Sequence, residues 1–532
     1  MSEITLSTIP NHVQKFLPFQ NRLSIISALI FPISLFLLWF IASNQHWMPS
    51  QILPTPQETL LAFKSLVTQD QLFQQIGISL SRLLFGLFIG TLFGLFFGTF
   101  LGYSKRFEQY VAPTFFALAI IPTLAWLPLL IIWLGIEDAL KIFLIFKASF
   151  IPIAIHTQSG IRDLNPQLRE ISQTLRLSKF HTFWKLLLPS ALPHFFIGLR
   201  TALSAAWTTL IAVELIASSE GIGYLMVYGR QLFQLDIVFV CIAIIGIIGF
   251  ILDFILNKIE KNFIVWPHTA LSVHHNHHKS KFSIKPFLIP LVIFLFWFWS
   301  TQTGVLDKNV LSHPRDVLTA ILHGISDGSI TSALLQSLYR AFLGLIIGGS
   351  LGVIIGLILG LHPRLSHIFS PTLNTLRLIA IFAWIPLITA WFGLGDLAKI
   401  IFISIATFFP IFVATLQGTF QVPKNLIEAA QSLKLTYWQR LVKLVIPSIV
   451  PTIFSGFRLS LLYAWMASFG VEYLMGSGSG IGIYMITAQQ NFDIDQVLAA
   501  TFFVAILGLV FAWLGQKAEQ LASAWRHSGE SK

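Results

Sequence analysis

Two stretches of this sequence are copies of each other: EISQTLRLSKFHTFWKLLLPSALP at Glu170–Pro193 and EAAQSLKLTYWQRLVKLVIPSIVP at Glu428–Pro451. Each begins with a glutamate, continues through a Leu-cation-Leu-hydroxyl turn and an amphipathic stretch, and ends with two prolines four residues apart. The copies keep a constant offset of 258 residues. The chain therefore contains a tandem repeat, and each copy of the repeat carries one polar, amphipathic island.

The composition of the chain is that of a membrane protein. Of its 532 residues, 55% are hydrophobic and 11% are charged, whereas soluble domains carry about 25% charged residues. Apolar runs of about 17–25 residues recur, and this length crosses ~30 Å of hydrocarbon. The net charge of +11 is attributed to Lys and Arg in cytoplasmic loops rather than to nucleic-acid binding. The single cysteine, Cys241, excludes a disulfide framework and a cysteine metal site.

The 258-residue offset extends over almost the whole chain. It also relates Trp39 to Trp297, Arg82 to Arg340, Asp138 to Asp396, and Pro152 to Pro410. Six apolar spans are predicted in each repeat, near 24–42, 79–102, 110–132, 139–158, 191–215 and 236–256, and near 286–303, 337–360, 368–390, 397–416, 449–473 and 496–515. Because six is even, both repeats have the same orientation. The sequence thus predicts an all-α polytopic membrane protein with about 12 transmembrane helices in two parallel six-helix repeats.

Charge and composition also predict the boundaries and the orientation. The expected parts are an N-terminal tail (1–22), a first repeat (23–257), a linker (258–285), a second repeat (286–516) and a C-terminal tail (517–532). The first apolar run lacks a small-residue cleavage site after it and is interpreted as a retained span. Lys and Arg gather in alternate connections, which predicts that both termini and both opening stretches are cytosolic. The linker holds a histidine cluster, 274–278, interpreted as flexible and solvated rather than as a metal site.

A glycine ladder runs along the second span of each repeat. Its central members are Gly90, Gly94 and Gly98, repeated as Gly348, Gly352 and Gly356. Helices in lipid pack through small residues because van der Waals contact requires close backbones. The ladder predicts a helix-packing face, and a role in the substrate pathway is the alternative.

Each opening stretch is predicted to form a helix, a tight turn and a second helix. Asn165-Pro166 suits a helix start, and Leu168, Ile171 and Leu175 form one apolar stripe. Thr436 begins a capping box for the second helix, and Ser178 is the candidate cap in the other copy. Pro189 and Pro447 then mark the entry into the fifth span of each repeat.

The second stretch resembles the EAA loop of ABC importer permeases, the membrane-spanning subunits of binding-protein-dependent uptake systems. In that family the loop forms a coupling helix that sits in a groove of the ATPase subunit. The resemblance implies that residues in both copies contact an ATPase: Glu170, Leu175, Arg176, Ser178 and Pro189, with Glu428, Ala429, Ala430, Leu433, Lys434, Thr436 and Pro447. An interfacial amphipathic helix is the alternative.

Further motifs resemble the nitrate, taurine and aliphatic-sulfonate branch of that family. They are AWLPL at 125–129, WLG at 133–135, GLR at 198–200 and GIGY at 221–224. Those permeases are usually one repeat long and dimerise, so this chain resembles a fused pair. The resemblance implies a bacterial inner membrane, a small anionic solute, two ATPase copies and an external substrate-binding protein. A thiamine-precursor pyrimidine is an alternative solute.

The chain itself is expected to be a transport subunit and not an enzyme. No G-x-x-x-x-G-K-[ST] motif occurs, so ATP and Mg are expected on the partner ATPase, with no cofactor or metal bound by this chain. The alternative from another class is a secondary transporter of two six-helix halves, which predicts ion-coupling carboxylates within the membrane.

The opening stretches depart from the family pattern at two places. The family usually has Gly after the Leu of the turn, where this chain has Arg176 and Lys434. If the turn needs a left-handed residue, a non-glycine there costs about 1 kcal/mol; contact with an acidic group on the ATPase is the alternative. The first copy also replaces Ala-Ala by Ile171-Ser172, which predicts two similar but non-equivalent contacts.

Four residues near the end of the fifth spans are candidates for the translocation pathway or a gate: Trp207, Glu214, Trp465 and Glu472. Charged groups in hydrocarbon are costly and mark functional sites by default. Three possibilities remain open for the glutamates: a gate, a position at the outer interface, or a structural pair with a nearby Lys or Arg. The tryptophans either line the path or pack.

Overall fold

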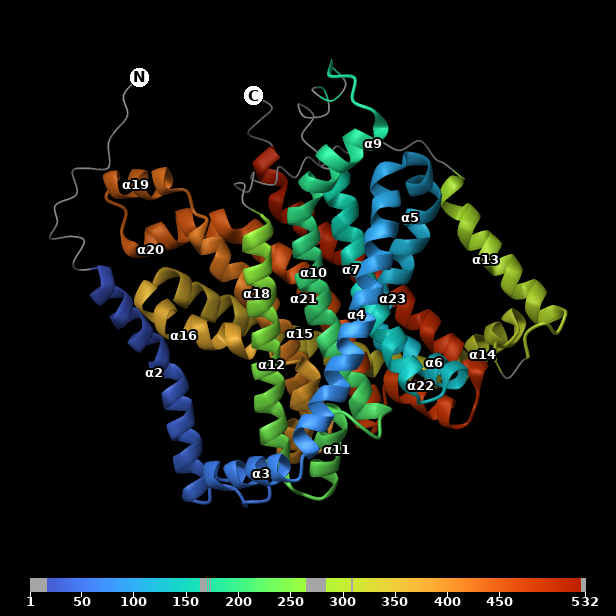
Figure 1. The fold of residues 1–532 in the computed structure, drawn as a ribbon, viewed down its shortest axis with the longest axis horizontal. Helices are drawn as coiled ribbons and strands as arrows, with labels where there is room; N and C mark the ends of the chain where they lie inside the picture. The colour runs from blue at the N-terminus through green and yellow to red at the C-terminus, as the bar shows by residue number, and fades with distance from the viewer. Residues whose placement is uncertain are drawn as a thin grey trace.

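The computed structural model describes residues 17–162, 170, 172, 174–264, 284–307 and 310–527, and helices make up nearly all of this part of the chain (Figure 1). The first repeat contains α2 (Leu17–Asn44), α3 (Pro56–Thr68), α4 (Gln71–Tyr103), α5 (Lys105–Ile120), η1 (Thr123–Trp126), α6 (Leu127–Leu134), α7 (Asp138–Arg162), α9 (Lys179–Thr182), η2 (Phe183–Leu187), α10 (Leu188–Ile216), α11 (Ile222–Gln231) and α12 (Leu235–Phe263).

The second repeat has the same order of elements. It contains α13 (Lys285–Gln302), α14 (Pro314–Ser326), α15 (Ser329–Leu361), α16 (Pro363–Leu376), η3 (Ile381–Trp384), α17 (Ile385–Phe392), α18 (Asp396–Phe420), α19 (Lys424–Ser432), α20 (Tyr437–Arg440), η4 (Leu441–Val445), α21 (Ile446–Met475), α22 (Ile481–Gln490) and α23 (Ile494–His527). The all-α fold with two repeats is as predicted.

Ten helices in the described part of the chain are long and apolar enough to cross a membrane, or twelve if each of two bent helix pairs counts as one span. The bent pairs correct the prediction of continuous third spans at 110–132 and 368–390. The chain turns by 91° between α5 and η1–α6, and by 92° between α16 and η3–α17. Pro122 explains the first break, because a residue before proline is driven out of the helical region, and Ile121 has φ −65° and ψ 121°.

The second break needs no proline. Ala380 stands at the position that Pro122 has in the first repeat. Its backbone angles, φ −54° and ψ 124°, are close to those of Pro122, φ −50° and ψ 137°. It is 2% exposed and lies in an apolar cluster with Trp207 and Leu210 of the first repeat. Packing between the repeats therefore holds a break that the local sequence does not encode.

The first spans are exchanged between the repeats. Helix α2 lies beside α16, and α13 lies beside α5 (Figure 1). The rings of Phe31 and Phe369 are 4.6 Å apart. Trp391 Nε1 donates to the carbonyl of Ile52 at 3.1 Å, and Trp133 Nε1 donates to the carbonyl of Val310 at 2.7 Å. Each repeat therefore holds the first span of the other.

The second and fourth spans of each repeat pack closely along the glycine ladder. A Cβ added to Gly94 would lie 2.9 Å from Ile153 Cβ on α7, and one added to Gly98 would lie 2.8 Å from Thr157 Cβ. In the second repeat a Cβ on Gly356 would lie 2.7 Å from Thr415 Cβ on α18. Gly90 faces Ser149, Gly348 faces Thr407, and Gly352 faces the carbonyl of Phe408. All six ladder glycines thus face a neighbouring helix.

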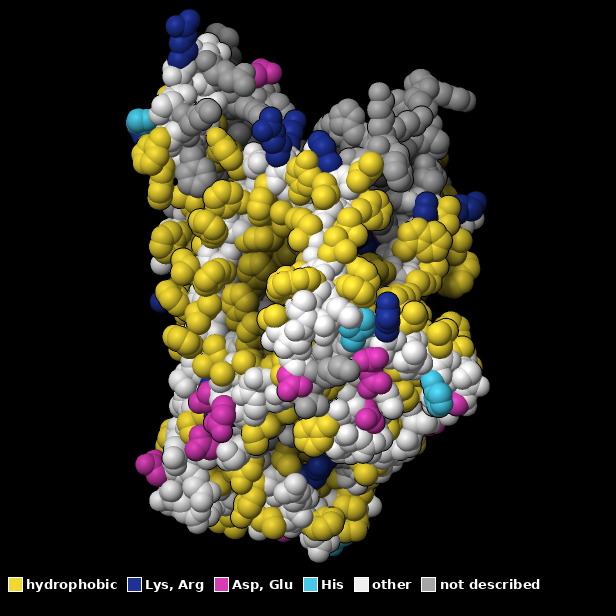
Figure 2. Space-filling view, turned by 90° about the vertical axis from the view of Figure 1, so that its right-hand side faces the viewer, with side chains coloured by type: hydrophobic (Ala, Val, Ile, Leu, Met, Phe, Trp, Pro, Cys, Tyr) yellow, Lys and Arg dark blue, Asp and Glu magenta, His cyan; other side chains and the backbone are white. Residues whose placement is uncertain are grey.

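The two ends of the molecule differ in charge. Helices α9, α19 and α20 lie at one end, called the α19 end, and α3 and α11 lie at the opposite end, called the α3 end (Figure 1). Figure 2 shows a hydrophobic belt between them, with most Lys and Arg toward the α19 end and most Asp and Glu toward the α3 end. This distribution matches a protein that crosses a membrane with its belt in the hydrocarbon.

Two of the repeat boundaries expected from the sequence, residues 257 and 516, fall within helices. Helix α12 continues to Phe263 and α23 to His527, past the positions 257 and 516 expected from the sequence. The histidine cluster 274–278 and the start of the N-terminal tail lie outside the described residues. Within the described residues, no group of three or more His, Cys, Asp or Glu side chains could hold a metal ion.

Candidate functional site

The opening stretch of the second repeat forms two short helices joined by a left-handed turn. Helix α19 ends at Ser432, and Lys434 follows with φ 49°. The amide of Lys434 donates to the carbonyl of Gln431 at 2.9 Å, and that of Leu435 donates to the carbonyl of Ala430 at 3.1 Å. This pair of bonds is a Schellman motif, which places a left-handed residue after the helix.

The first repeat forms the same turn with Arg176. This residue has φ 48°, and the amide of Leu177 donates to the carbonyl of Ser172 at 3.1 Å. Ser172 is buried, as is its counterpart Ala430 in the second repeat. The replacement of alanine by serine in the first copy therefore lies on the inner side of the knob helix. Asn165-Pro166 and Leu168 lie outside the described residues, as does the side chain of Ile171.

Side-chain caps start the second helix of each copy. Thr436 Oγ1 accepts from the amide of Gln439 at 3.3 Å, and Gln439 Oε1 accepts from the amide of Thr436 at 3.0 Å. Ser178 Oγ accepts from the amide of His181 at 3.3 Å and lies 2.8 Å from its Nδ1. Both caps fall on the residues that the sequence indicated.

A π-helical turn connects each copy to the long helix that follows. The turns are η2 and η4, immediately before Pro189 in α10 and Pro447 in α21. Proline has no amide hydrogen, so an α-helical bond from that position is impossible and the ladder is locally widened. Val445 and Ile449 pack in a cluster with Val422. The two short helices are thus fixed to the end of a membrane-spanning helix.

Both copies present uncovered apolar side chains at the α19 end. Leu433 is 72% exposed and Trp438 69%, and in the first copy Leu175 is 65% and Phe180 68% exposed. Large apolar residues grouped on a surface outside the hydrophobic belt mark an interaction site. The two copies form what we call the paired knobs, residues 170–187 and 424–445, of which the side chains of residues 171, 173, 179 and 183 are not described.

The charged side chains of the paired knobs are also exposed. Glu170, Arg176, Glu428 and Lys434 all point to the surface. The structure records no ion pair between any of these four and another described residue. Ala429 is exposed, and Ala430 faces inward with 4% exposure. These charges are therefore available to a partner.

The glutamates of the fifth spans form buried ion pairs. Arg82 Nη1 lies 3.2 Å from Glu214 Oε1, and Arg340 Nη1 lies 2.7 Å from Glu472 Oε1. Glu214 is 1% exposed and Glu472 is fully buried. The structure therefore shows the pairing with an arginine that the sequence analysis left open, and both carboxylates are enclosed by protein.

Each buried carboxylate is also held by a serine and by a glycine-rich turn. Ser337 Oγ donates to Glu472 Oε2 at 2.7 Å, and the amide of Gly482 donates to it at 3.2 Å. Gly480 has φ 144°, and a Cβ there would collide with the Glu472 carboxylate. Ser79, Gly221 and Gly223 repeat the arrangement around Glu214. The carboxylate thereby fixes the loop at the α3 end onto the second span.

The two tryptophans of the fifth spans are core residues. Trp465 is 1% exposed and its Nε1 donates to the carbonyl of Val504 at 3.1 Å. Trp207 is 3% exposed, and its Nε1 has no hydrogen-bond partner among the described residues. A Cβ on Gly249 would lie 3.4 Å from that Nε1 and 2.8 Å from the carbonyl of Leu378. In this conformation both indoles pack between helices.

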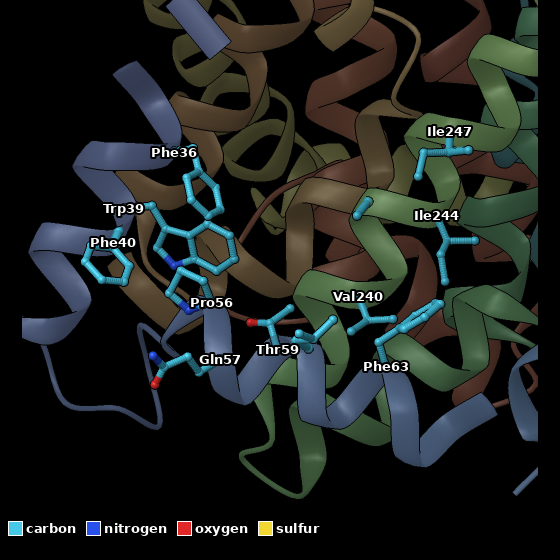
Figure 3. Close-up of a pocket in the computed structure, with 12 residues that line it drawn as sticks. Phe36, Trp39, Phe40, Pro56, Gln57, Thr59, Phe63, Val240, Ile244 and Ile247 are labelled. Atoms are coloured by element: carbon cyan, nitrogen blue, oxygen red, sulfur yellow. The ribbon is translucent and has the colours of Figure 1, made fainter. Parts of the chain in front are cut away.

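An apolar groove with a volume of about 510 Å³ lies between α2, α3 and α12. Trp39 and Phe36 line one side, Phe63 and Thr59 lie along α3, and Ile244 projects from α12 (Figure 3). None of the candidate coupling, packing or pathway residues lines it. An uncharged groove of this kind at the hydrophobic belt fits lipid chains better than a polar solute.

The sequence reasoning missed the partners of the buried glutamates. Arg82, Ser79 and Asp138 belong to one network, in which Arg82 Nε donates to Asp138 Oδ1 at 2.8 Å. The available signal was an arginine inside an apolar span that recurs at the repeat offset as Arg340. An intramembrane cation of this kind requires an anionic partner.

Comparison with known proteins agrees with this architecture. The model of the family described as "Binding-protein-dependent transport system inner membrane component" matches residues 90–265 and again 348–521. An aliphatic sulfonates transport permease protein, SsuC, of Escherichia coli (strain K12) is 37% identical over 235 residues, which are 44% of this chain and 89% of that relative. The SsuC protein of Bacillus subtilis (strain 168) is 33% identical over 249 residues, 47% of this chain and 90% of the relative.

A third relative is the taurine transport system permease protein TauC of Escherichia coli (strain K12), 31% identical over 234 residues, which cover 43% of this chain and 85% of TauC. Each relative is therefore about one repeat long. The family match accounts for both repeats and favours a permease over the secondary transporter considered above. This chain belongs to the family of binding-protein-dependent transport system inner membrane components, and it carries two copies of the family domain in tandem.

Proposed function

We propose that this chain is the complete membrane-spanning part of an ATP-driven ABC importer, with both permease units on one polypeptide. The observation that carries the proposal is the pair of rigid knobs at the α19 end. Each knob has a Schellman turn, a capped second helix and a π-helical junction to a long membrane helix. Such a rooted unit can transfer a displacement from a partner into the membrane, whereas a flexible loop would absorb it.

The proposed partners at the knobs are two copies of an ABC ATPase subunit, one for each knob. The uncovered side chains of Leu175 and Phe180, and of Leu433 and Trp438, supply the apolar contact, and Glu170 and Glu428 supply the charged contact. ATP and Mg would bind to the ATPase subunits. ATP binding would bring the knobs together and so move α10 relative to α21.

The α19 end is proposed to face the cytosol of a bacterium, with the chain in its inner membrane and both termini on the cytosolic side. This orientation rests on the Lys and Arg near the α19 end and the Asp and Glu near the α3 end (Figure 2), because cytoplasmic segments carry an excess of Lys and Arg. The α3 end would then receive a soluble substrate-binding protein.

The proposed solute is a small anion of the sulfonate, taurine or nitrate kind. This choice rests on the names of the relatives, which are transport permeases for aliphatic sulfonates and taurine. In this proposal the soluble substrate-binding protein contributes much of the specificity for the solute.

The test of the proposal is a combined substitution, Glu170→Ala with Glu428→Ala. We expect the double variant to insert normally but to lose co-purification of the ATPase encoded beside it and to lose ATP-dependent uptake. The matched control is Glu137→Ala, which removes an exposed carboxylate at the opposite end. Wild-type uptake in the double variant, or uptake by the unmodified protein that persists after ATP depletion, would refute the proposal.

A further inference from the structure

The apolar groove between α2, α3 and α12 opens onto the surface that faces lipid. Each of the three helices contributes an exposed side chain to its wall: Phe36 of α2 is 51% exposed, Leu60 of α3 54% and Ile247 of α12 57%. Helices α2 and α12 are both long and apolar enough to cross a membrane, and hydrocarbon surrounds helices of this kind. A lipid is therefore the molecule that is always in contact with the groove.

Two polar residues in the wall of the groove, Trp39 and Thr59 (Figure 3), form hydrogen bonds within the protein. Thr59 Oγ1 donates to the carbonyl of Thr55 at 3.1 Å, and Trp39 Nε1 donates to the carbonyl of Pro54 at 2.9 Å. Apart from Gln57, whose side chain is exposed, the wall therefore offers only apolar contacts. Such a wall suits an alkyl chain rather than a solute that forms hydrogen bonds.

Side chains close the corresponding region of the second repeat. Val317 stands at the position that Thr59 has in the first repeat, and it is 7% exposed. It belongs to an apolar cluster against which Trp297 and Phe503 pack. Phe503 corresponds to Ile244 of the groove at the offset of 259 residues, so a larger ring lies there. The groove is therefore a feature of the first repeat and is not required by the fold that both repeats share.

An exposed cation lies on the same face of α3 as the groove. Lys64 follows Leu60 by four residues and Gln57 by seven, which places the three side chains on one face of the helix. Leu60 and Gln57 both line the groove, and the structure records no ion pair between Lys64 and another described residue. The second repeat also has a cation here, since Arg315 replaces Gln57 while Leu322 replaces Lys64. The closed cluster, rather than charge alone, thus distinguishes the two repeats.

We propose that this groove binds one acyl chain of a phospholipid from the membrane leaflet at the α3 end, with the phosphate of the lipid beside Lys64. The apolar wall supplies the contact with the chain, and the ammonium group supplies the contact with the headgroup. The bound chain fills the space that the exchanged helix α2 leaves beside α12. This proposal requires only that the protein spans a membrane, and it does not depend on the ATPase contacts proposed above.

The test counts the phospholipid molecules that stay on the purified full chain. Native mass spectrometry in a mild detergent follows a titration with dioleoylphosphatidylglycerol, because each bound lipid adds its own mass to the protein. The filled variant carries Thr59→Val with Ile244→Phe, the residues of the second repeat. Ile251→Phe is the matched control, since Ile251 is 46% exposed on α12 but does not line the groove. Lys64→Gln removes the charge and leaves the groove open.

We expect the unmodified protein and Ile251→Phe to retain one phosphatidylglycerol molecule more tightly than any further one. The filled variant should keep the unfolding midpoint of the lipid-free protein and lose this molecule. Lys64→Gln should keep it with an affinity about fivefold lower, as expected for one basic residue beside an anionic lipid. If the filled variant does not fold, Ala243→Phe gives an independent measurement, because Ala243 lines the groove and the second repeat has Phe502 there.

The proposal is overturned if the unmodified protein retains no more phosphatidylglycerol than the filled variant, or if Lys64→Gln binds it with unchanged affinity. A dimer of the full chain that the filled variant cannot form would assign the groove to a second copy and would overturn the proposal as well. Failure of the transport proposal has a different signature, because it concerns ATPase recruitment at the knobs and leaves the number of bound lipids unchanged.

Discussion

At the scale of single residues, two buried carboxylates organise the α3 end of the molecule. Glu214 and Glu472 each accept bonds from an arginine, a serine and a backbone amide. A buried charge is tolerated only when such partners replace water. These residues therefore act as clamps between the second span, the fifth span and the connecting loop.

The clamp predicts unequal costs for its two acidic members. Glu472→Ala would leave Arg340 buried without its partner and should destabilise the protein by about 3–5 kcal/mol. Asp396→Asn removes a carboxylate that also contacts Arg340 but is 59% exposed, so the cost should stay below about 1 kcal/mol. Unfolding midpoints of the purified variants in one detergent measure the difference. An equal loss of stability in the two variants would show that burial of the carboxylate does not determine the cost of removing it.

Residue-level prediction from the sequence succeeded where a local rule applies. Thr436 and Ser178 cap helices as their sequence context indicates, and Arg176 and Lys434 occupy the left-handed position that the family fills with glycine. The role of Glu214 could not be decided, because its partners Ser79 and Arg82 lie 135 and 132 residues away in the chain. Such pairings are fixed by tertiary packing.

At the scale of elements, the glycine ladders determine how closely the second and fourth spans approach. The faces of α4 and α15 that carry the ladders admit side chains of α7 and α18 almost to the backbone. In lipid this contact supplies much of the association energy, since the surrounding chains are as apolar as the helices. The ladder is thus a structural feature of each repeat.

Alanine substitutions on one helix should separate packing from helix propensity. A Cβ at position 94 would lie 2.9 Å from Ile153 Cβ and 3.0 Å from the Phe150 carbonyl, whereas nothing lies within 4 Å of one at position 77. Gly94→Ala should therefore cost about 1–3 kcal/mol, and Gly77→Ala should be neutral or stabilise α4 by up to about 1 kcal/mol. Unfolding followed by circular dichroism tests this, and a loss in Gly77→Ala matching that in Gly94→Ala would contradict it.

Element boundaries were predicted well for continuous apolar runs and poorly for the third spans. The signal for the first break, Ile121-Pro122, is visible in the sequence. The second break at Ala380 has no local signal, because the surrounding helices impose it. The short helices α3, α14, α11 and α22 were not predicted either, since they lie in connections whose apolar periodicity is brief.

At the scale of the whole molecule, the two repeats are joined by the exchanged first spans as well as by an apolar cluster that both repeats share, which includes Leu124 and Phe382. We expect a short bis-maleimide to link Phe31→Cys on α2 to Phe369→Cys on α16. In a chain with a protease site inserted between the repeats, the two fragments should then stay joined after cleavage. The native Cys241 is fully buried and need not be removed.

The single variants Phe31→Cys and Phe369→Cys serve as controls and should yield two separate fragments after cleavage. Separation of the fragments in the double variant as well would show that α2 packs against its own repeat. The exchange was not predictable from the sequence. Because the two repeats have similar sequences, the first span of one repeat can pack against either repeat through similar apolar faces.

The exchange of first spans determines when the contacts of α2 can form during synthesis of the chain. The bond between Trp391 and the Ile52 carbonyl joins residues 339 positions apart. At about 5–20 residues per second, the ribosome needs roughly 20–70 s to supply the partner that α2 awaits. Helix α13, in contrast, meets α5 already inserted. The first half of the chain is therefore incompletely folded for much of a minute, while α2 is exposed to lipid without its partner helix. A membrane chaperone or protease would act on the chain during this interval.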